Sequence, residues 1–445
     1  MNKIIYFEKK ALELLKILTL PYMIGFVQGH SYLTQQQIMD VKNALNSNDN
    51  NKDIVTDYEQ RLSDLIGNGY GISFASGRMA FYSILKTLNI GKGDEVILPA
   101  FTCSVMLNAI WRTGATPVFT EIDPETFGSD ADGIKKKITP RTKAIVAQHS
   151  FGIPCNINEI LELAEKYGIY VIEDCAITFD STINGIKVGN FGDAAIFSTD
   201  HSKPVNTIIG GFFYSNNRSL YEKVKVFSSE LLQLDNRHQK RLYEQFLFER
   251  KYYTPEKYPR SIILNNYNAL KKRLSSGKNE FTFLEGDYKK QGSQDSGYPY
   301  PSRIPSFLAQ IGIFELERWE KEKKHRKNLL NQYLDIISES NSNKFISREY
   351  FNPEKDIVPL RFVFRHPDHK NMMRRMSQFI DVNWTWFMEP IICCPDGPGS
   401  LGYNQGTCNK TEKVCNEIIN WPCVLDESWD SKLMEIFRKI INDEK

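Results

Sequence analysis

The sequence predicts an α/β protein, with a mostly parallel central sheet in a large domain and a smaller α+β domain toward the C-terminus. Three observations lead to this prediction. Between about residues 34 and 217, short β-rich runs alternate with segments that repeat apolar residues at helical spacing. Beyond residue 297, a long amphipathic segment precedes a mixture of strand-like and helical patterns. A length of 445 residues leaves room for two or three domains.

Six strand-like runs are expected in the first half of the chain. They are Gly69–Ala75, Asp94–Pro99, Thr116–Ile122, Lys143–Gln148, Ile169–Asp174 and Asp193–Ser198. Amphipathic segments such as Met79–Leu88 and Ile157–Gly168 lie between them and are expected to be helices. Because strand and helix alternate in this way, the sheet is predicted to be mostly parallel and covered on both faces.

The second half of the chain has a different pattern. Residues 227–297 are rich in Lys, Arg and Tyr and end in the stretch KKQGSQDSG, which is typical of an exposed loop. One long helix is expected over Ser306–Ser338, followed by a strand at Arg361–Phe364 and helices around Lys413–Ile419 and Lys432–Ile441. The expected division is an N-terminal extension (1–30), a large domain (31–226), a basic and aromatic insertion (227–297), and the long helix with the small domain (298–445).

Composition excludes several classes of protein. The 56 basic and 54 acidic residues nearly balance, so no overall field favours nucleic acid as a partner. Eight cysteines show no CxxC and no zinc-site spacing, so no metal is expected and the thiols are interpreted as reduced, in a cytoplasmic protein. The longest apolar run, Ile17–Val27, contains a proline and is too short to span a bilayer.

Polar residues stand at the ends of three predicted strands, where open parallel sheets bind ligands. Ser76-Gly77-Arg78 joins a strand to a helix, and free N–H groups there can hold an anion. Asp174 ends an apolar strand, where a carboxylate needs a partner. Lys203 follows a third strand, where apolar walls would make it a nucleophile. Taken singly, each site favours an ordinary explanation: a plain turn, a structural ion pair or a solvated lysine. Together, in this order, they are the parts that hold pyridoxal phosphate.

Several motifs in this region resemble those of a known family. The motifs are NIGKGDEVILPAFTCSVMLNAIWRTGATPVFTEIDPETF, ITPRTKAIVAQHSFGIP and YVIEDCA, and they keep order and spacing between about Leu33 and Asn217. They are similar to motifs of the DegT/DnrJ/EryC1/StrS sugar aminotransferases, which are pyridoxal-phosphate enzymes of the aspartate-aminotransferase fold (fold type I). Weaker similarity continues in YPSRIPSFLAQIGIFELERWEKEKKHR, from Tyr300, and in CNKTEKVCNEIINWPC, from Cys408.

The resemblance implies a role for each matching residue. Lys203 matches the Schiff-base lysine, and Asp174 the carboxylate that pairs with the pyridine nitrogen. The other residues expected to contact the cofactor are Gly77, Arg78 and Ser198, at the phosphate, and Cys103, where the family commonly has a stacking aromatic ring. Substrate contacts are assigned to His149, His201 and Arg303. The resemblance also implies a homodimer with active sites at the subunit interface.

The implied activity is transamination. Glutamate would supply an amine, and a keto-sugar carried on a nucleotide would receive it, for the synthesis of a surface polysaccharide or glycan.

Four positions depart from the family pattern, namely Arg78 in place of Thr, Cys103 in place of an aromatic residue, Ile177 in place of Gln or His, and Pro301-Ser302 in place of an Asn. Three alternatives therefore stay open. They are sugar dehydration, transamination of a non-sugar ketone or aldehyde, and a non-catalytic dimeric relative. The basic and apolar N-terminal segment and insertion are interpreted as a helix packed on the dimer and a loop, with peripheral membrane contact as the alternative.

Overall fold

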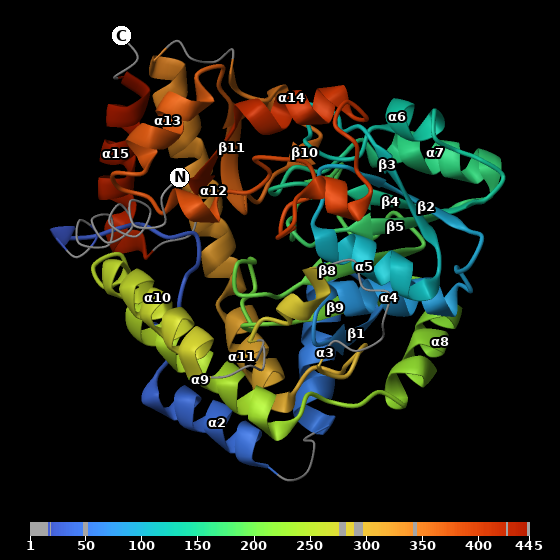
Figure 1. Cartoon of the computed structure of the whole chain (residues 1–445), viewed down its shortest axis with the longest axis horizontal. Coiled ribbons are helices and arrows are strands. Elements are labelled where there is room, and N and C mark those ends of the chain that lie inside the picture. Colours follow the sequence, from blue (N-terminus) through green and yellow to red (C-terminus); the bar gives the residue numbers. More distant parts are fainter. Residues whose placement is uncertain are drawn as a thin grey trace.

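The computed structural model describes residues 17, 19–47, 52–275, 282–288, 297–340, 345–423 and 426–442. Side chains of residues 269–275 are not described. A large domain contains the central sheet, and the C-terminal elements, orange to red in Figure 1, form a smaller layer beside it. Within the described ranges, no helix has the length and apolar character needed to cross a membrane.

The central sheet has seven strands, and all six predicted runs are among them. In spatial order they are β1 (Tyr70–Phe74), β9 (Gly211–Ser215), β8 (Ala194–Ser198), β5 (Tyr170–Asp174), β4 (Thr142–Gln148), β2 (Glu95–Pro99) and β3 (Thr116–Thr120). β9 is the one strand of this sheet that runs in the opposite direction to the other six. It is also the strand that the sequence did not predict. The other pairs, from β8 to β3, are parallel. The predicted mostly parallel α/β sheet is therefore confirmed.

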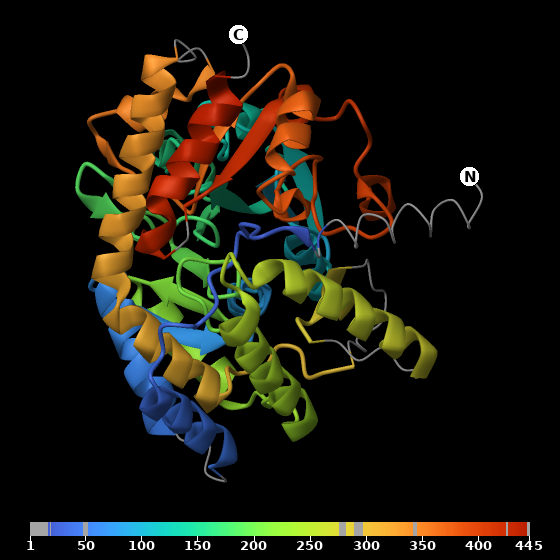
Figure 2. The same cartoon turned by 90° about the vertical axis from the view of Figure 1, so that its left-hand side faces the viewer.

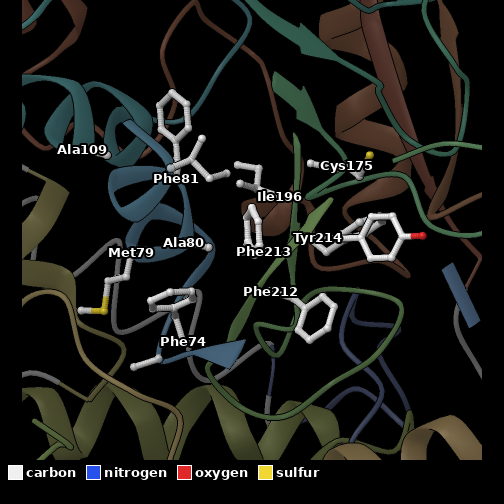
Figure 3. Packing of buried hydrophobic residues seen from close by; sticks show 14 of the residues in the cluster. Phe74, Met79, Ala80, Phe81, Ala109, Cys175, Ile196, Phe212, Phe213 and Tyr214 are labelled. Carbon is white, nitrogen blue, oxygen red and sulfur yellow. The ribbon is translucent and has the colours of Figure 1, made fainter. Parts of the chain in front are cut away.

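Helices cover both faces of this sheet because its strands are apolar on both sides. In β2, Val96 and Leu98 join one buried cluster, whereas Ile97 joins another on the opposite face. The first face is covered by α4 (Gly77–Thr87), α5 (Ser104–Thr113) and α8 (Arg218–Ser229), the second by α7 (Ile157–Tyr167), as Figure 1 shows. Figure 3 shows Phe81 of α4 beside Ile196 and Phe213 of the sheet. The short helix α6 (Ala131–Lys135) packs against α7.

The helix predicted over Ser306–Ser338 is two helices, so that prediction was wrong. They are α11 (Ser306–Glu317) and α12 (Trp319–Glu339), which meet at Arg318, where φ is −95° and ψ is −4°. Trp319, directly after the break, is buried and donates its indole N–H to Asp180 at 2.9 Å. This tertiary contact fixes the break, and because apolar residues keep their spacing across it, the sequence pattern did not reveal it.

The two helices connect the domains. α11 packs on α2 (Gln35–Asn46) and α3 (Lys52–Ile66) of the large domain. α12 runs along one side of the molecule toward the C-terminal elements (Figure 2). These elements are α13 (His369–Met376), α14 (Asn409–Glu417), α15 (Asp430–Asn442) and an antiparallel pair, β11 (Arg361–Arg365) and β12 (Ile418–Pro422). They form the predicted α+β arrangement. A smaller sheet joins β10 (Lys355–Asp356) to β6 (Thr182–Ile183) and β7 (Ile186–Lys187).

The insertion is largely helical. It contains α9 (Asn236–Tyr252), α10 (Tyr258–Ser275) and the short 3₁₀ helix η1 (Glu285–Tyr288). Leu242 and Phe246 of α9 belong to the core of the large domain. Except for Gly297, the loop predicted at KKQGSQDSG lies outside the described residues.

The described part of the N-terminal segment packs within the chain. Ile24 pairs with Ile380 of the small domain, and the N–H of Met23 donates to Pro255 at 3.0 Å. Met23 and Val27 also share a buried cluster with Tyr253, near the end of α9. The end of the apolar run Ile17–Val27 is therefore covered by other parts of the same chain.

Candidate active site

One cavity of about 250 Å³ opens at the carboxyl ends of β5 and β8. Six residues that the sequence analysis assigned to the cofactor line it, and they come from four separate segments of the chain. These residues are Gly77, Arg78, Cys103, Asp174, Ser198 and Lys203. His201 also lines the cavity, whereas His149 and Arg303 do not.

The start of α4 is open to this cavity. Its N-cap residue, Ser76, makes no capping hydrogen bond, and the buried Ser76 Oγ has no partner among the described residues. The first N–H groups of a helix lack acceptors within the helix and favour anions. A Cβ on Gly211 would collide with the backbone of Ser76 and Gly77, so glycine lets β9 lie directly against this turn. The arrangement has the features that favour an anion at this helix start.

Asp174 lies buried at the end of β5. One carboxylate oxygen accepts the N–H of Ala176 at 2.9 Å, and the carboxylate lines the cavity. Burial raises the pKa of Asp174, although the Ala176 N–H and the charges of Lys203 and His149 oppose this effect. An ionised Asp174 would therefore be best stabilised by a cationic N–H group placed in the cavity.

Lys203 lies on the loop between β8 and β9. Its backbone N–H donates to Asp200 at 2.9 Å, and its Nζ lies 4.3 Å from the ring centroid of Trp386. Burial lowers the pKa of Lys203 and outweighs the opposing carboxylates of Asp200 and Asp174. This environment favours the neutral, nucleophilic amine.

Arg78 has its charge neutralised inside the protein. Its Nε donates to Asp287 at 2.7 Å, and its Nη2 donates to the carbonyl of Leu284 at 2.8 Å. Asp287, which is fully buried, also binds Arg112 at 3.2 Å. Burial alone would lower the pKa of Arg78, but the Asp287 carboxylate raises it. Arg78 therefore offers a ligand its backbone N–H, while its side chain fixes the insertion over the cavity.

The predicted substrate residues have different surroundings. His201 stacks on Phe283 at 4.4 Å, and its Nδ1 lies 2.9 Å from Glu249 of α9. His149 is fully buried outside the cavity, between the N–H of Cys155 and the carboxylate of Glu173.

Arg303 lies away from the cavity. Its backbone N–H donates to Leu232 at 3.2 Å, and the residue forms bridges with Phe74 and Gln233. The structure therefore brings His201 to the cofactor residues and leaves His149 and Arg303 apart from them.

Two groups of lining residues were missed by the sequence reasoning. Trp384, Trp386 and Phe387 come from a loop of the small domain, and Phe283, Glu285 and Tyr288 come from the insertion. The aromatic residues in the stretch NWTWF (383–387) could have indicated that this segment lines a binding cavity. Ile177 also lines the cavity. Ile177, in place of the Gln or His of the family pattern, thus makes this part of the cavity wall apolar.

Comparison with known proteins identifies the family. The sequence profile of the DegT/DnrJ/EryC1/StrS aminotransferase family matches residues 31–248. A GDP-perosamine synthase of Escherichia coli O157:H7 is 38% identical over 173 residues, which are 39% of this chain and 48% of that protein. A UDP-N-acetyl-3-dehydro-alpha-D-glucosamine 3-aminotransferase of Acidithiobacillus ferrooxidans is 40% identical over 168 residues, 38% of this chain and 46% of that protein. The chain thus spans about half the length of these two relatives.

A longer match covers nearly the whole chain. An uncharacterized protein of Methanocaldococcus jannaschii is 37% identical over 406 residues, 87% of this chain and 90% of that protein. Among solved structures, an aminotransferase from Psychrobacter cryohalolentis gives a TM-score of 0.68 at 19% identity and covers 92% of this chain and 98% of its own. A putative sugar aminotransferase from Streptococcus pneumoniae, in its PLP form, gives the same score and identity over 95% of this chain and 99% of its own. These structures share the fold, and the sequence matches assign the chain to the DegT/DnrJ/EryC1/StrS aminotransferase family.

Proposed function

We propose that this protein is a pyridoxal-phosphate-dependent aminotransferase that converts a nucleotide-linked keto-sugar to an amino sugar, with glutamate as the amine donor. The observation that carries this proposal is the cavity that joins the amine of Lys203, the carboxylate of Asp174 and the uncapped start of α4. Family membership supports the reaction class. The names of the relatives from Escherichia coli and Acidithiobacillus ferrooxidans support a nucleotide sugar as substrate.

The residues fit pyridoxal phosphate on structural grounds. The Ser76 Oγ, which has no partner in the described part of the chain, and the N–H groups of Gly77 and Arg78 at the start of α4 suit the phosphate. Asp174 suits a protonated pyridine nitrogen, and Lys203 suits the aldehyde carbon. When bound, the cofactor supplies an electron-accepting ring that stabilises negative charge on the carbon that carries the amine.

The protein's own groups then act on protons and orientation. The carboxylate of Asp174 would hold a proton at the ring nitrogen by forming an ion pair there. Burial lowers the pKa of Lys203, and in its neutral form the Nζ can accept a proton from the carbon of the donor and release it to the carbon of the sugar. The tryptophans at 384 and 386 exclude water from this side of the cavity.

The proposal extends to location and assembly. Because all eight cysteines are free, a reducing compartment such as the cytoplasm is the location that we propose. We also propose a homodimer, the assembly that the family resemblance implies. Light scattering of the purified protein tests the assembly, and a monomer at working concentration would contradict it.

Absorbance spectroscopy tests the central claim. The purified protein should bind pyridoxal phosphate and show a visible absorbance band that is absent in Lys203→Ala. Lys166→Ala is the control, because Lys166 is exposed at the end of α7, away from the cavity. A colourless wild-type protein that cannot be reconstituted with the cofactor would overturn the proposal.

The amine donor is tested in the same preparation. Glutamate should abolish the visible band, and a keto-sugar nucleotide should then restore it, with the aminated product identified by mass spectrometry. A band that forms but does not respond to any amino acid would instead indicate a non-catalytic relative.

A further inference from the structure

Two cysteines from distant parts of the sequence meet in the wall of the cavity. Cys103 is the N-cap residue of α5, and Cys393 belongs to the small-domain loop that follows Phe387. Backbone hydrogen bonds hold the two segments together: Ile392 N–H donates to Thr102 at 2.9 Å, and Ser104 N–H donates to Ile392 at 3.0 Å. The thiols of Cys103 and Cys393 are close enough for each to shift the pKa of the other.

The pair is both held in place and accessible. Ser104 Oγ donates to the carbonyl of Cys393 at 2.7 Å, which fixes the loop beside α5. Ile391 and Cys393 have φ values of 56° and 60°, a left-handed conformation that non-glycine residues seldom adopt. Cys393 is exposed and Cys103 is half-buried. Both residues line the cavity, so a small solute that enters it passes beside them.

The surroundings make Cys103 the more reactive thiol. The interaction with the Cys393 thiol lowers the pKa of Cys103, and the N–H of Val105 and the charges of Lys203 and Arg78 act in the same direction against burial. The same pairing raises the pKa of Cys393. A thiol at a helix start and beside cations is the usual setting of a reactive cysteine.

We propose that Cys103 and Cys393 form a reversible disulfide, and that this wall of the cavity is a modification site for small disulfides such as oxidised glutathione. Cys103, as thiolate, attacks one sulfur of the small disulfide, the S–S bond breaks, and one small thiol leaves after taking up a proton. The Cys393 thiol then loses its proton and attacks Cys103 Sγ, which releases the second small thiol. In total, two protein thiols are oxidised to one disulfide and one small disulfide is reduced to two thiols.

The other cysteines differ from this pair. Five of them are buried, namely Cys155, Cys175, Cys408, Cys415 and Cys423. Cys394 is half-buried and donates its thiol hydrogen to the carbonyl of Gly397 at 2.9 Å. Cys394 does not line the cavity, although it is adjacent to Cys393 in the chain. It is therefore a matched control for reactivity in the same loop.

The test is disulfide mapping of the full chain after treatment with oxidised glutathione. A non-reduced digest should contain one cross-linked peptide that joins Cys103 to Cys393, and dithiothreitol should remove it. Cys393→Ser should trap glutathione on Cys103, and Cys103→Ser should slow the loss of thiols about tenfold or more. Cys394→Ser should behave as the wild type.

Several results would overturn the proposal. They are the absence of the cross-linked peptide from the wild-type digest, a link between Cys393 and Cys394, and loss of the cross-link in Cys394→Ser. Because mapping the wild type is sufficient, a variant that fails to fold does not remove the test. The experiment requires no cofactor and no substrate, so its outcome is independent of the proposed aminotransferase activity.

Discussion

Asp287, in η1 of the insertion, links the insertion to the helices α4 and α5 beside the cavity. It is fully buried and binds two arginines, Arg78 of α4 and Arg112 of α5. Asp287→Asn should lower the free energy of unfolding by about 3–5 kcal/mol, because it removes the carboxylate charge that binds the buried Arg78. Chemical denaturation measures this change.

An exposed ion pair supplies the control for that substitution. Asp57 binds Arg61 at 2.9 Å, with both side chains 45% exposed. Asp57→Asn should change the free energy of unfolding by no more than about 1 kcal/mol, since solvent screens such pairs. Equal effects of the two substitutions would show that Asp287 has no special structural role.

Single residues also show how far the sequence could predict the site. Asp174 and Lys203 were singled out because they follow predicted strands, Ser198 was assigned through the family resemblance, and all three line one cavity. The roles of these residues stay predictions. Asp287 and Trp386 could not be placed, because their partners are distant in sequence and no local pattern records a long-range ion pair or ring contact.

At the scale of elements, β9 is the strand that brings the turn at Ser76-Gly77 and the loop of Lys203 together. It lies between β1 and β8, antiparallel to both. Gly211, its first residue, contacts the start of α4 so closely that a Cβ would collide with Ser76 and Gly77. The sequence analysis did not predict this strand, which begins at Gly211.

Gly211→Ala should therefore disturb the anion site. The added methyl group must push β9 away from α4, which should cost about 1–3 kcal/mol in the free energy of unfolding. It should also weaken binding of pyridoxal phosphate, measured by absorbance titration. Gly399→Ala is the control, because nothing lies within 4 Å of a Cβ at Gly399. If pyridoxal phosphate binds both variants equally well, the close approach of β9 is not required for the site.

At the scale of the whole molecule, the cavity is built by three regions that the sequence analysis treated separately. The sheet supplies the cofactor residues, the insertion supplies Phe283 and Tyr288, and the small domain supplies Trp384 and Trp386. The α/β sheet could be predicted because its pattern is local and repeated. The covering of the cavity by the insertion and the small-domain loop could not be predicted, because it depends on how these non-repeating segments pack against the sheet.

His201 joins the same three regions and gives a prediction about pH. It contacts Phe283 and Trp384 through its ring and Glu249 of α9 through Nδ1. Burial lowers the pKa of His201, but the carboxylates of Asp200 and Glu249 outweigh burial and the charge of Lys203, and raise it. The folded protein therefore binds the His201 proton more tightly than the unfolded chain does.

The sign of the effect follows from this raised pKa. The stabilisation by protonated His201 is complete below the ordinary histidine pKa and is lost as the pH rises through the folded-state pKa. Glu249→Gln should therefore destabilise the protein more at about pH 6 than at about pH 9, when unfolding is measured by denaturant titration at both values. His201→Gln should reduce this pH dependence of the wild type. If the difference in the free energy of unfolding between wild type and Glu249→Gln stays constant with pH, Glu249 holds α9 by packing alone. Protonation of His201 would then have no part in holding α9 beside the cavity.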